Sequence, residues 1–171
     1  MRTALSLFLF CLFLNIGFSQ KNIDATLKKL NKNSVPYISV EELASAQNLI
    51  LLDTRQKEEF TVSKIKNAVW VGYKKFKIED IQKKIPNRNT PIVVYCSIGV
   101  RSEDIGEKLQ NHGYTKVKNL YGGIFEWKNK GRAVYNAQNK KTKKVHAFSK
   151  QWGKLLTNAE KIYTINSKSN D

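Results

Sequence analysis

Residues 91–102 read PIVVYCSIGVRS and join an apolar run to a short loop that begins with a cysteine. The run from Ile92 to Tyr95 is typical of a strand buried on both faces, as strands of parallel sheets are. Residues 102–112 fit a helix, with Ile105 and Leu109 facing inward. The stretch therefore predicts a buried strand, a loop carrying Cys96, and a helix.

The same alternation continues along the chain. Further strands are expected at 48–53, 68–71 and 117–121, and helices at 40–46, 57–60, 78–85 and 124–130. Strands that alternate with helices at this spacing predict an α/β fold, with a largely parallel central sheet flanked by helices on both faces.

The loop after Cys96 has the composition of an anion-binding site. Ligands of open α/β sheets bind beyond the carboxyl ends of the strands, where Cys96 is expected. The loop N–H groups and the following helix N-terminus favour negative charge, and Arg101 adds a cation, so the thiolate form of Cys96 is favoured. A buried structural thiol is the alternative, which the strand-end position disfavours. The predicted anion-binding residues are Ser97, Ile98, Gly99, Val100 and Arg101.

Composition limits the remaining classes of function. Two cysteines exclude a disulfide scaffold, and with two histidines the chain has too few ligands for a Cys/His zinc cluster. We therefore expect no metal and no cofactor. The formal net charge of +16 predicts anionic partners, which could be small oxyanions, nucleic acid or an acidic surface.

The N-terminus has the pattern of a signal peptide. Residues 1–20 read MRTALSLFLFCLFLNIGFSQ, in which Arg2 precedes a short apolar run and small residues at 17 and 19. The run is short for a membrane-spanning helix, although an uncleaved anchor is an alternative. Residues 1–19 are the predicted signal, and we expect export to the periplasm or beyond, with no stable membrane insertion after cleavage. Cys96 is then the single cysteine of the mature chain.

Three regions follow the signal. They are a weakly helical lead-in at 20–34, the α/β domain at 35–135 and a basic extension at 136–171. Between Trp127 and Ala159 there are nine Lys and Arg and no acidic residue, which favours a solvated extension that attracts anionic substrates by charge. An anion-binding or membrane-surface tail is the alternative, and the apolar residues at 145–148, 152, 155–156 and 162–163 could pack part of the extension onto the domain.

Four ordered motifs resemble rhodanese-like sulfurtransferases. In Cys96–Ser102 a cysteine and an arginine flank four residues, as in that family's active-site loop. DTRQKEEF at 53–60 is similar to its Asp-x-Arg-x-x-x-Glu-aromatic motif. Asn67-Ala68 and Gly122-Gly123, the latter with Trp127, are similar to its later motifs. Ser63-Lys64-Ile65 departs from the family's usual Gly-His-Ile, which we interpret as a change in a structural turn.

The resemblance implies a chemistry. Cys96 would accept a sulfane sulfur from thiosulfate or a similar small anionic donor and pass it, as a persulfide, to cyanide or a thiol. Arg101 and the loop amides would bind the donor. Asp53, Arg55 and Glu59 would form a supporting ion-pair and hydrogen-bond network rather than act in catalysis.

Three other functions compete with sulfur transfer. Cysteine phosphatases on this fold use a loop one residue longer than the four residues between Cys96 and Arg101, so the present loop is small for a phosphoryl group. A rhodanese-like module that only binds, or that carries persulfide to a partner, stays as the main alternative. Nucleic-acid binding rests on charge alone, and export would separate the protein from most nucleic acid, so we expect none.

Overall fold

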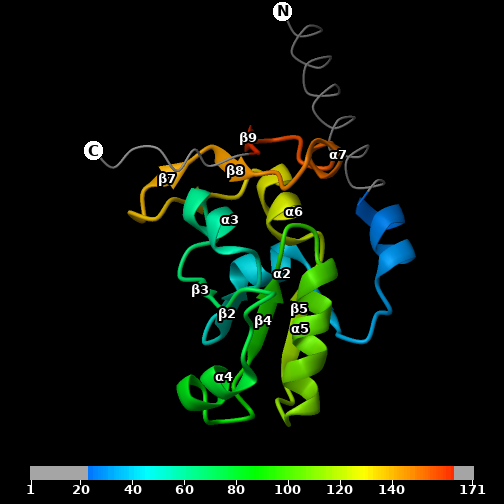
Figure 1. Ribbon diagram of the computed structural model, residues 1–171, viewed down its shortest axis with the longest axis vertical. Coiled ribbons are helices and arrows are strands. Elements are labelled where there is room, and N and C mark those ends of the chain that lie inside the picture. Colours follow the sequence, from blue (N-terminus) through cyan, green and yellow to red (C-terminus); the bar gives the residue numbers. More distant parts are fainter. Residues whose placement is uncertain (1–22, 164–171) are drawn as a thin grey trace, which may run out of the picture.

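The computed structural model describes residues 23–163, in which a five-stranded sheet is the central element (Figure 1). All strand pairings in this sheet are parallel, in the order β1-β5-β4-β2-β3. The strands are β1 (Tyr37–Ile38), β2 (Ile50–Asp53), β3 (Val69–Trp70), β4 (Ile92–Tyr95) and β5 (Val117–Leu120). The predicted signal peptide lies outside the described residues.

The central strands are buried on both faces, as their apolar runs predict. Side chains of a strand alternate between faces. Val93 and Tyr95 of β4 accordingly belong to one hydrophobic cluster and Ile92 and Val94 to the other. A strand covered on both faces therefore needs apolar residues at successive positions, as β4 has.

Helices cover both faces of the sheet. On the Val94 face lie α4 (Ile78–Lys84) and α5 (Val100–Asn111). On the opposite face lie a helix at 23–30, α2 (Val40–Ser45) and α6 (Gly123–Asn129). The short helix α3 (Lys57–Val62) follows β2. The predicted α/β class, with a parallel sheet between two helical layers, is confirmed.

The basic extension is folded, not solvated, over much of its length. It contains β7 (Lys141–Thr142), β8 (Lys144–His146), α7 (Lys150–Gly153) and β9 (Glu160–Ile162), and it directly follows β6 (Val134–Tyr135). β6 pairs with β7 and β8 with β9, and β8 packs against α3 at one end of the molecule (Figure 1). Buried in the core are Val145, Ala147, Leu155 and Leu156.

The expectation of a solvated extension acting through charge alone is therefore wrong for this segment. Its lysines lie on the outside while the apolar residues between them enter the core. The lead-in is likewise part of the fold, because Ile23 and Leu27 are buried in the same cluster as Leu156. The three predicted regions thus share one hydrophobic core.

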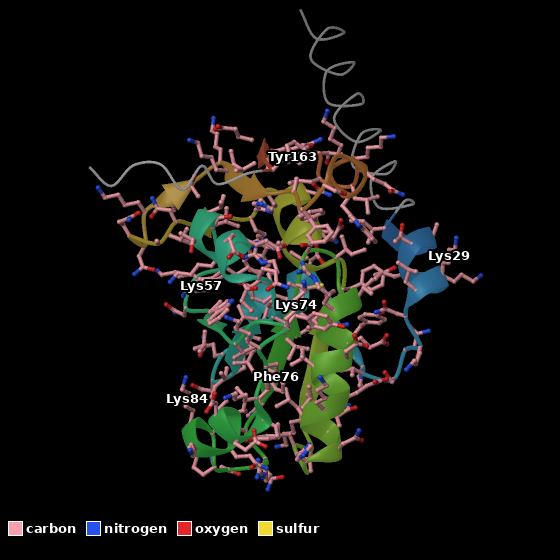
Figure 2. The ribbon with its side chains drawn as sticks, in the orientation of Figure 1. Lys29, Lys57, Lys74, Phe76, Lys84 and Tyr163 are labelled. Atoms are coloured by element: carbon pink, nitrogen blue, oxygen red, sulfur yellow. The ribbon has the colours of Figure 1, made fainter. Side chains whose placement is uncertain are left out.

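Positive charge is spread over the surface instead of being confined to one tail. Figure 2 shows Lys29, Lys57 and Lys84 projecting from separate elements, namely the first helix, α3 and α4. Within residues 23–163 no helix has the length and apolar character needed to cross a bilayer.

Candidate active site

Cys96 lies directly after β4, at the carboxyl end of the sheet. Its side chain is 1% exposed, and its Sγ accepts a hydrogen bond from the backbone N–H of Gly99 at 3.1 Å. Gly99 is the N-cap of α5 and has φ +109°. That conformation is accessible almost only to glycine. It turns the chain so that the α5 N-terminus, whose first N–H groups have no partner within the helix, begins beside the sulfur.

Two asparagines fix the loop from outside, and neither was predicted from the sequence. The carbonyl oxygen of Gly99 accepts hydrogen bonds from Asn119 Nδ2 at 2.8 Å and Asn31 Nδ2 at 3.0 Å. Asn119 is fully buried and also accepts a bond from the hydroxyl of Ser102. Asn119 lies two residues after Val117, on the face of β5 opposite to exposed Lys118, and a polar residue at such an inward-facing position is the signal that could have identified it.

The start of α6 closes the loop from a third side. The N–H groups of Ile124 and Phe125 donate to the carbonyl oxygens of Cys96 and Ser97, both at 3.0 Å. Gly123 has φ +54°, and a Cβ added there would lie 2.7 Å from the carbonyl oxygen of Ser97 and closer still to that of Cys96. The glycine therefore allows the helix end to bond directly to the loop.

We expect Gly123→Ala to lower the activity of the Cys96 site about 100-fold, because the new methyl group must push the Cys96 loop away from α6 and a shift of about 1 Å at a reacting group has this effect. Steady-state kinetics would measure the loss. The control is Gly131→Ala, at φ +76° with nothing within 4 Å of the added Cβ, which introduces comparable backbone strain without the clash. Equal activity losses in the two variants would contradict the requirement for close approach between α6 and the Cys96 loop.

Arg101 and Glu59 form a bidentate ion pair beside the loop. The two Arg101–Glu59 hydrogen bonds measure 2.7 and 2.8 Å, and the hydroxyl of Ser97 bonds both side chains. Burial opposes ionisation of Glu59, but the hydrogen bond and charge of Arg101 outweigh it and lower the pKa of this carboxyl. Sequence analysis grouped Glu59 with Asp53 and Arg55, whereas the structure also pairs it with the loop arginine.

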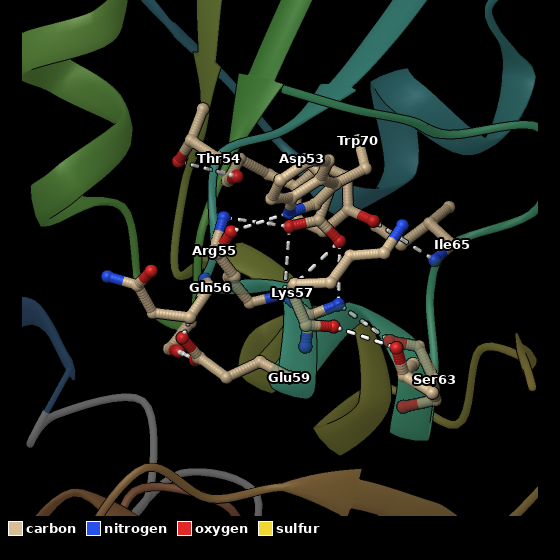
Figure 3. A network of polar contacts seen from close by, with 12 residues as sticks. Asp53, Thr54, Arg55, Gln56, Lys57, Glu59, Ser63, Ile65 and Trp70 are labelled. Atoms are coloured by element: carbon tan, nitrogen blue, oxygen red, sulfur yellow. Dashed lines mark hydrogen bonds and ion pairs between the residues drawn. The ribbon is translucent and has the colours of Figure 1, made fainter. Parts of the chain in front are cut away.

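Asp53 and Arg55 form a second, fully buried pair behind the loop (Figure 3). Arg55 bonds both carboxylate oxygens of Asp53 and the carbonyl oxygen of Ser63, the last at 2.6 Å. Despite burial, which opposes its charge, the pKa of Arg55 is raised by Asp53. This geometry ties the end of β2 to the end of α3 and fits the supporting role predicted for these two residues.

We expect substitutions of Arg101 and Glu59 to have non-additive effects on the free energy of unfolding. Arg101→Ala leaves a carboxylate with a 2% exposed side chain unpaired, so it should destabilise the fold by about 3 kcal/mol. Adding Glu59→Gln to Arg101→Ala removes the unpaired buried charge. The loss of unfolding free energy in the double variant should therefore be about 1–3 kcal/mol smaller than the sum of the losses in the two single variants. Urea unfolding of the wild type and three variants measures this cycle. Additive losses would contradict the coupling.

A pocket opens onto Cys96, and two of the residues that line it come from the C-terminal segment. Its volume is about 160 Å³, and it is lined by Cys96, Ser97, Ile98, Val100, Arg101, Phe148 and Trp152. Phe148 and Trp152 were not predicted as site residues. Gly99 lies within the loop and contributes its backbone. Within residues 23–163 no group of three or more His, Cys, Asp and Glu side chains could hold a metal ion.

A buried thiol at the carboxyl end of a parallel strand, bonded by a loop amide at the N-terminus of the next helix, defines the class: a parallel α/β domain with a cysteine at its ligand-binding edge. The model of the rhodanese-like domain matches residues 39–130. This is more than half of the chain, and the chain belongs to the rhodanese-like family.

Two curated relatives show how far the similarity extends. Thiosulfate sulfurtransferase GlpE of Coxiella burnetii is 24% identical over 94 residues, which are 55% of this chain and 85% of that protein. Adenylyltransferase and sulfurtransferase UBA4 of Debaryomyces hansenii is 31% identical over 102 residues. That match covers 53% of this chain and 23% of the UBA4 protein, so most of the latter has no counterpart here.

Two solved structures support the fold. Thiosulfate sulfurtransferase from Pseudomonas aeruginosa has a TM-score of 0.56 at 20% identity, covering 81% of this chain and 26% of that one. The BH2092 protein from Bacillus halodurans has a TM-score of 0.54 at 21% identity, covering 66% of this chain and 85% of that one. At these identities the likeness shows the fold alone.

Proposed function

We propose that this protein is a sulfurtransferase in which Cys96 carries the transferred sulfur as a persulfide. The single observation that carries the proposal is the 3.1 Å hydrogen bond from the Gly99 N–H to Cys96 Sγ, at the N-terminus of α5. This position stabilises a negative sulfur, both as thiolate and as persulfide anion. Membership of the rhodanese-like family and the two relatives named as sulfurtransferases support it.

The proposed reaction has two steps that balance without a cofactor. The Cys96 thiolate attacks the sulfane sulfur of thiosulfate or a similar donor, and the S–S bond of the donor breaks. With thiosulfate, sulfite leaves with the electron pair and a Cys96 persulfide anion is formed. A thiolate or cyanide then takes the outer sulfur, which gives a new persulfide or thiocyanate and returns the Cys96 thiolate.

Mass spectrometry of the purified protein after incubation with thiosulfate tests the proposal. We expect the mass of one added sulfur atom on the peptide that contains Cys96, and its loss when cyanide is added. If no sulfur is added under any donor, the enzyme proposal fails and the protein is a rhodanese-like binding module.

We propose further that the protein acts outside the cytoplasm. The support is the sequence pattern of Arg2 followed by an apolar run and a small-residue site at residues 17–19. In protein isolated from its native host, the first peptide should begin at or near Gln20. A cytoplasmic protein with intact Met1 would contradict export.

A further inference from the structure

The pocket above Cys96 has walls that suit an apolar group better than an inorganic dianion. Its apolar lining residues are Ile98 and Val100 of the loop region and Phe148 and Trp152 of the C-terminal segment. Among residues 23–163, Arg101 is the one charged side chain that lines the pocket. Both of its terminal nitrogens already bond Glu59, whose carboxylate offsets its charge.

The ring of Phe148 also contacts the guanidinium of Arg101. The guanidinium carbon lies 5.1 Å from the centroid of the Phe148 ring, which is within the range of a cation–π contact. Negative charge on a donor therefore meets the backbone amides of the loop, while its other atoms meet hydrocarbon. A donor such as thiosulfate has no apolar atoms that could use these walls.

The two aromatic residues are held in place by specific local contacts. The Phe148 N–H donates to Nδ1 of His146 at 3.2 Å, and Phe148 has φ +64°, a conformation rare for an aromatic residue. The hydroxyl of Ser149 caps α7 by accepting the N–H of Trp152. Trp152 packs against the core cluster that contains Leu156, yet Phe148 is 50% exposed at the pocket. A positive φ and a large exposed apolar ring beside a reactive thiol indicate a positioned substrate wall.

From this arrangement we infer that Phe148 and Trp152 determine donor specificity, and that they select a sulfane-sulfur donor carrying an apolar group of about the size of a benzene ring. The inference rests on the proposed function and names the substrate class of that site. An engineered cavity of about 150 Å³ lined by Leu, Ile and Phe binds benzene, and the present pocket measures about 160 Å³. Both aromatic residues lie outside residues 39–130, so this wall belongs to the C-terminal segment and not to the matched family region.

The step to be tested is sulfur transfer from an organic thiosulfonate. The Cys96 thiolate attacks the terminal sulfur of R–SO2–S⁻, the S–S bond breaks, and the sulfinate R–SO2⁻ leaves with the electron pair. Benzenethiosulfonate and methanethiosulfonate carry the same charge and differ in the apolar group. Dividing each kcat/KM by the rate constant of the same donor with a free cysteine derivative removes differences in intrinsic reactivity.

We expect the wild type, corrected in this way, to prefer benzenethiosulfonate by about 10-fold or more, the lower range of what a hydrophobic pocket yields per added group. Trp152→Leu and Phe148→Asn should each reduce that preference several-fold; asparagine tolerates the left-handed backbone of residue 148. The matched control is Tyr163→Leu, which removes an exposed aromatic ring of the same segment that does not line the pocket, and which should keep the wild-type preference.

The outcomes separate the inference from the proposed function. A wild-type preference below about 2-fold, or a preference that Phe148→Asn and Trp152→Leu leave intact, overturns the specificity role while sulfur transfer stands. If neither thiosulfonate nor thiosulfate adds sulfur to Cys96, both the proposed function and this inference fall.

Discussion

Cys96→Ser is expected to abolish sulfur transfer and to leave the fold intact. The serine oxygen can accept the Gly99 N–H bond that Sγ accepts now, and it is no larger than sulfur, so the free energy of unfolding should change by about 1 kcal/mol or less. Oxygen at this position cannot carry a sulfane sulfur. Thiocyanate formation should therefore fall to the rate of the uncatalysed reaction, with an unchanged circular dichroism spectrum.

The second cysteine of the chain provides the control. Cys11 lies in the predicted signal peptide, so Cys11→Ser in the full-length chain should retain sulfur transfer and the added sulfur on the Cys96 peptide. Turnover by Cys96→Ser at the wild-type rate would show that another group carries the sulfur, and the persulfide mechanism would have to be abandoned.

A chain that ends at Asn136 is expected to lose cooperative folding. It lacks Val145, Leu155 and Leu156, which are 0%, 9% and 0% exposed. Burial of such side chains stabilises a fold by about 1.5–3 kcal/mol each, and a domain of this kind has a total stability of about 5–15 kcal/mol. The shortened chain would also lose two hydrogen bonds of Asn129, which donates to the carbonyl oxygen of Leu155 and accepts from the N–H of Thr157. Thermal unfolding followed by circular dichroism should show no sharp transition.

Point variants of the full-length chain show whether the C-terminal extension stabilises the fold through packing or through charge. Leu156→Ala should destabilise the full-length chain by about 2–5 kcal/mol, as truncation of a buried leucine does. Lys154→Ala, at an exposed position two residues away, should change stability by about 0.5 kcal/mol or less. An unaltered transition in the chain ending at Asn136 would instead support the solvated extension that the composition favoured.

The strands and the reactive loop were predictable because their signals are local. The apolar run at 92–95 is buried in full, because a strand that is covered on both faces buries side chains on alternate sides. The cysteine loop is a contiguous motif, and Gly99 marks the turn into α5 within it. The helix positions followed for the same reason, since the spacing of apolar residues within one segment defines the buried face of a helix.

Contacts between distant segments could not be derived in this way. Glu59 and Arg101 are 42 residues apart, and the sequence motif that contains Glu59 placed it with Asp53 and Arg55. Strands β7, β8 and β9 have two or three residues each, too few to show a period, and they lie in a segment whose lysines dominate its composition. Net charge describes the average of a segment, whereas packing depends on the few apolar side chains between the charges.

The sequence by itself determined the α/β class, the strand-end position of Cys96 and the family, because each depends on the order of residues within a short stretch. Tertiary structure alone decided that Arg101 is paired with Glu59 and that Phe148 and Trp152 wall the pocket above the thiol. Glu59 and Arg101 meet because the parallel strands β2 and β4 bring their carboxyl ends to one edge of the sheet, and Phe148 and Trp152 reach that edge because the C-terminal segment packs on α3 and on the core. Contacts at this edge join segments that are far apart along the chain, so the sequence of one segment does not show which other segment it contacts.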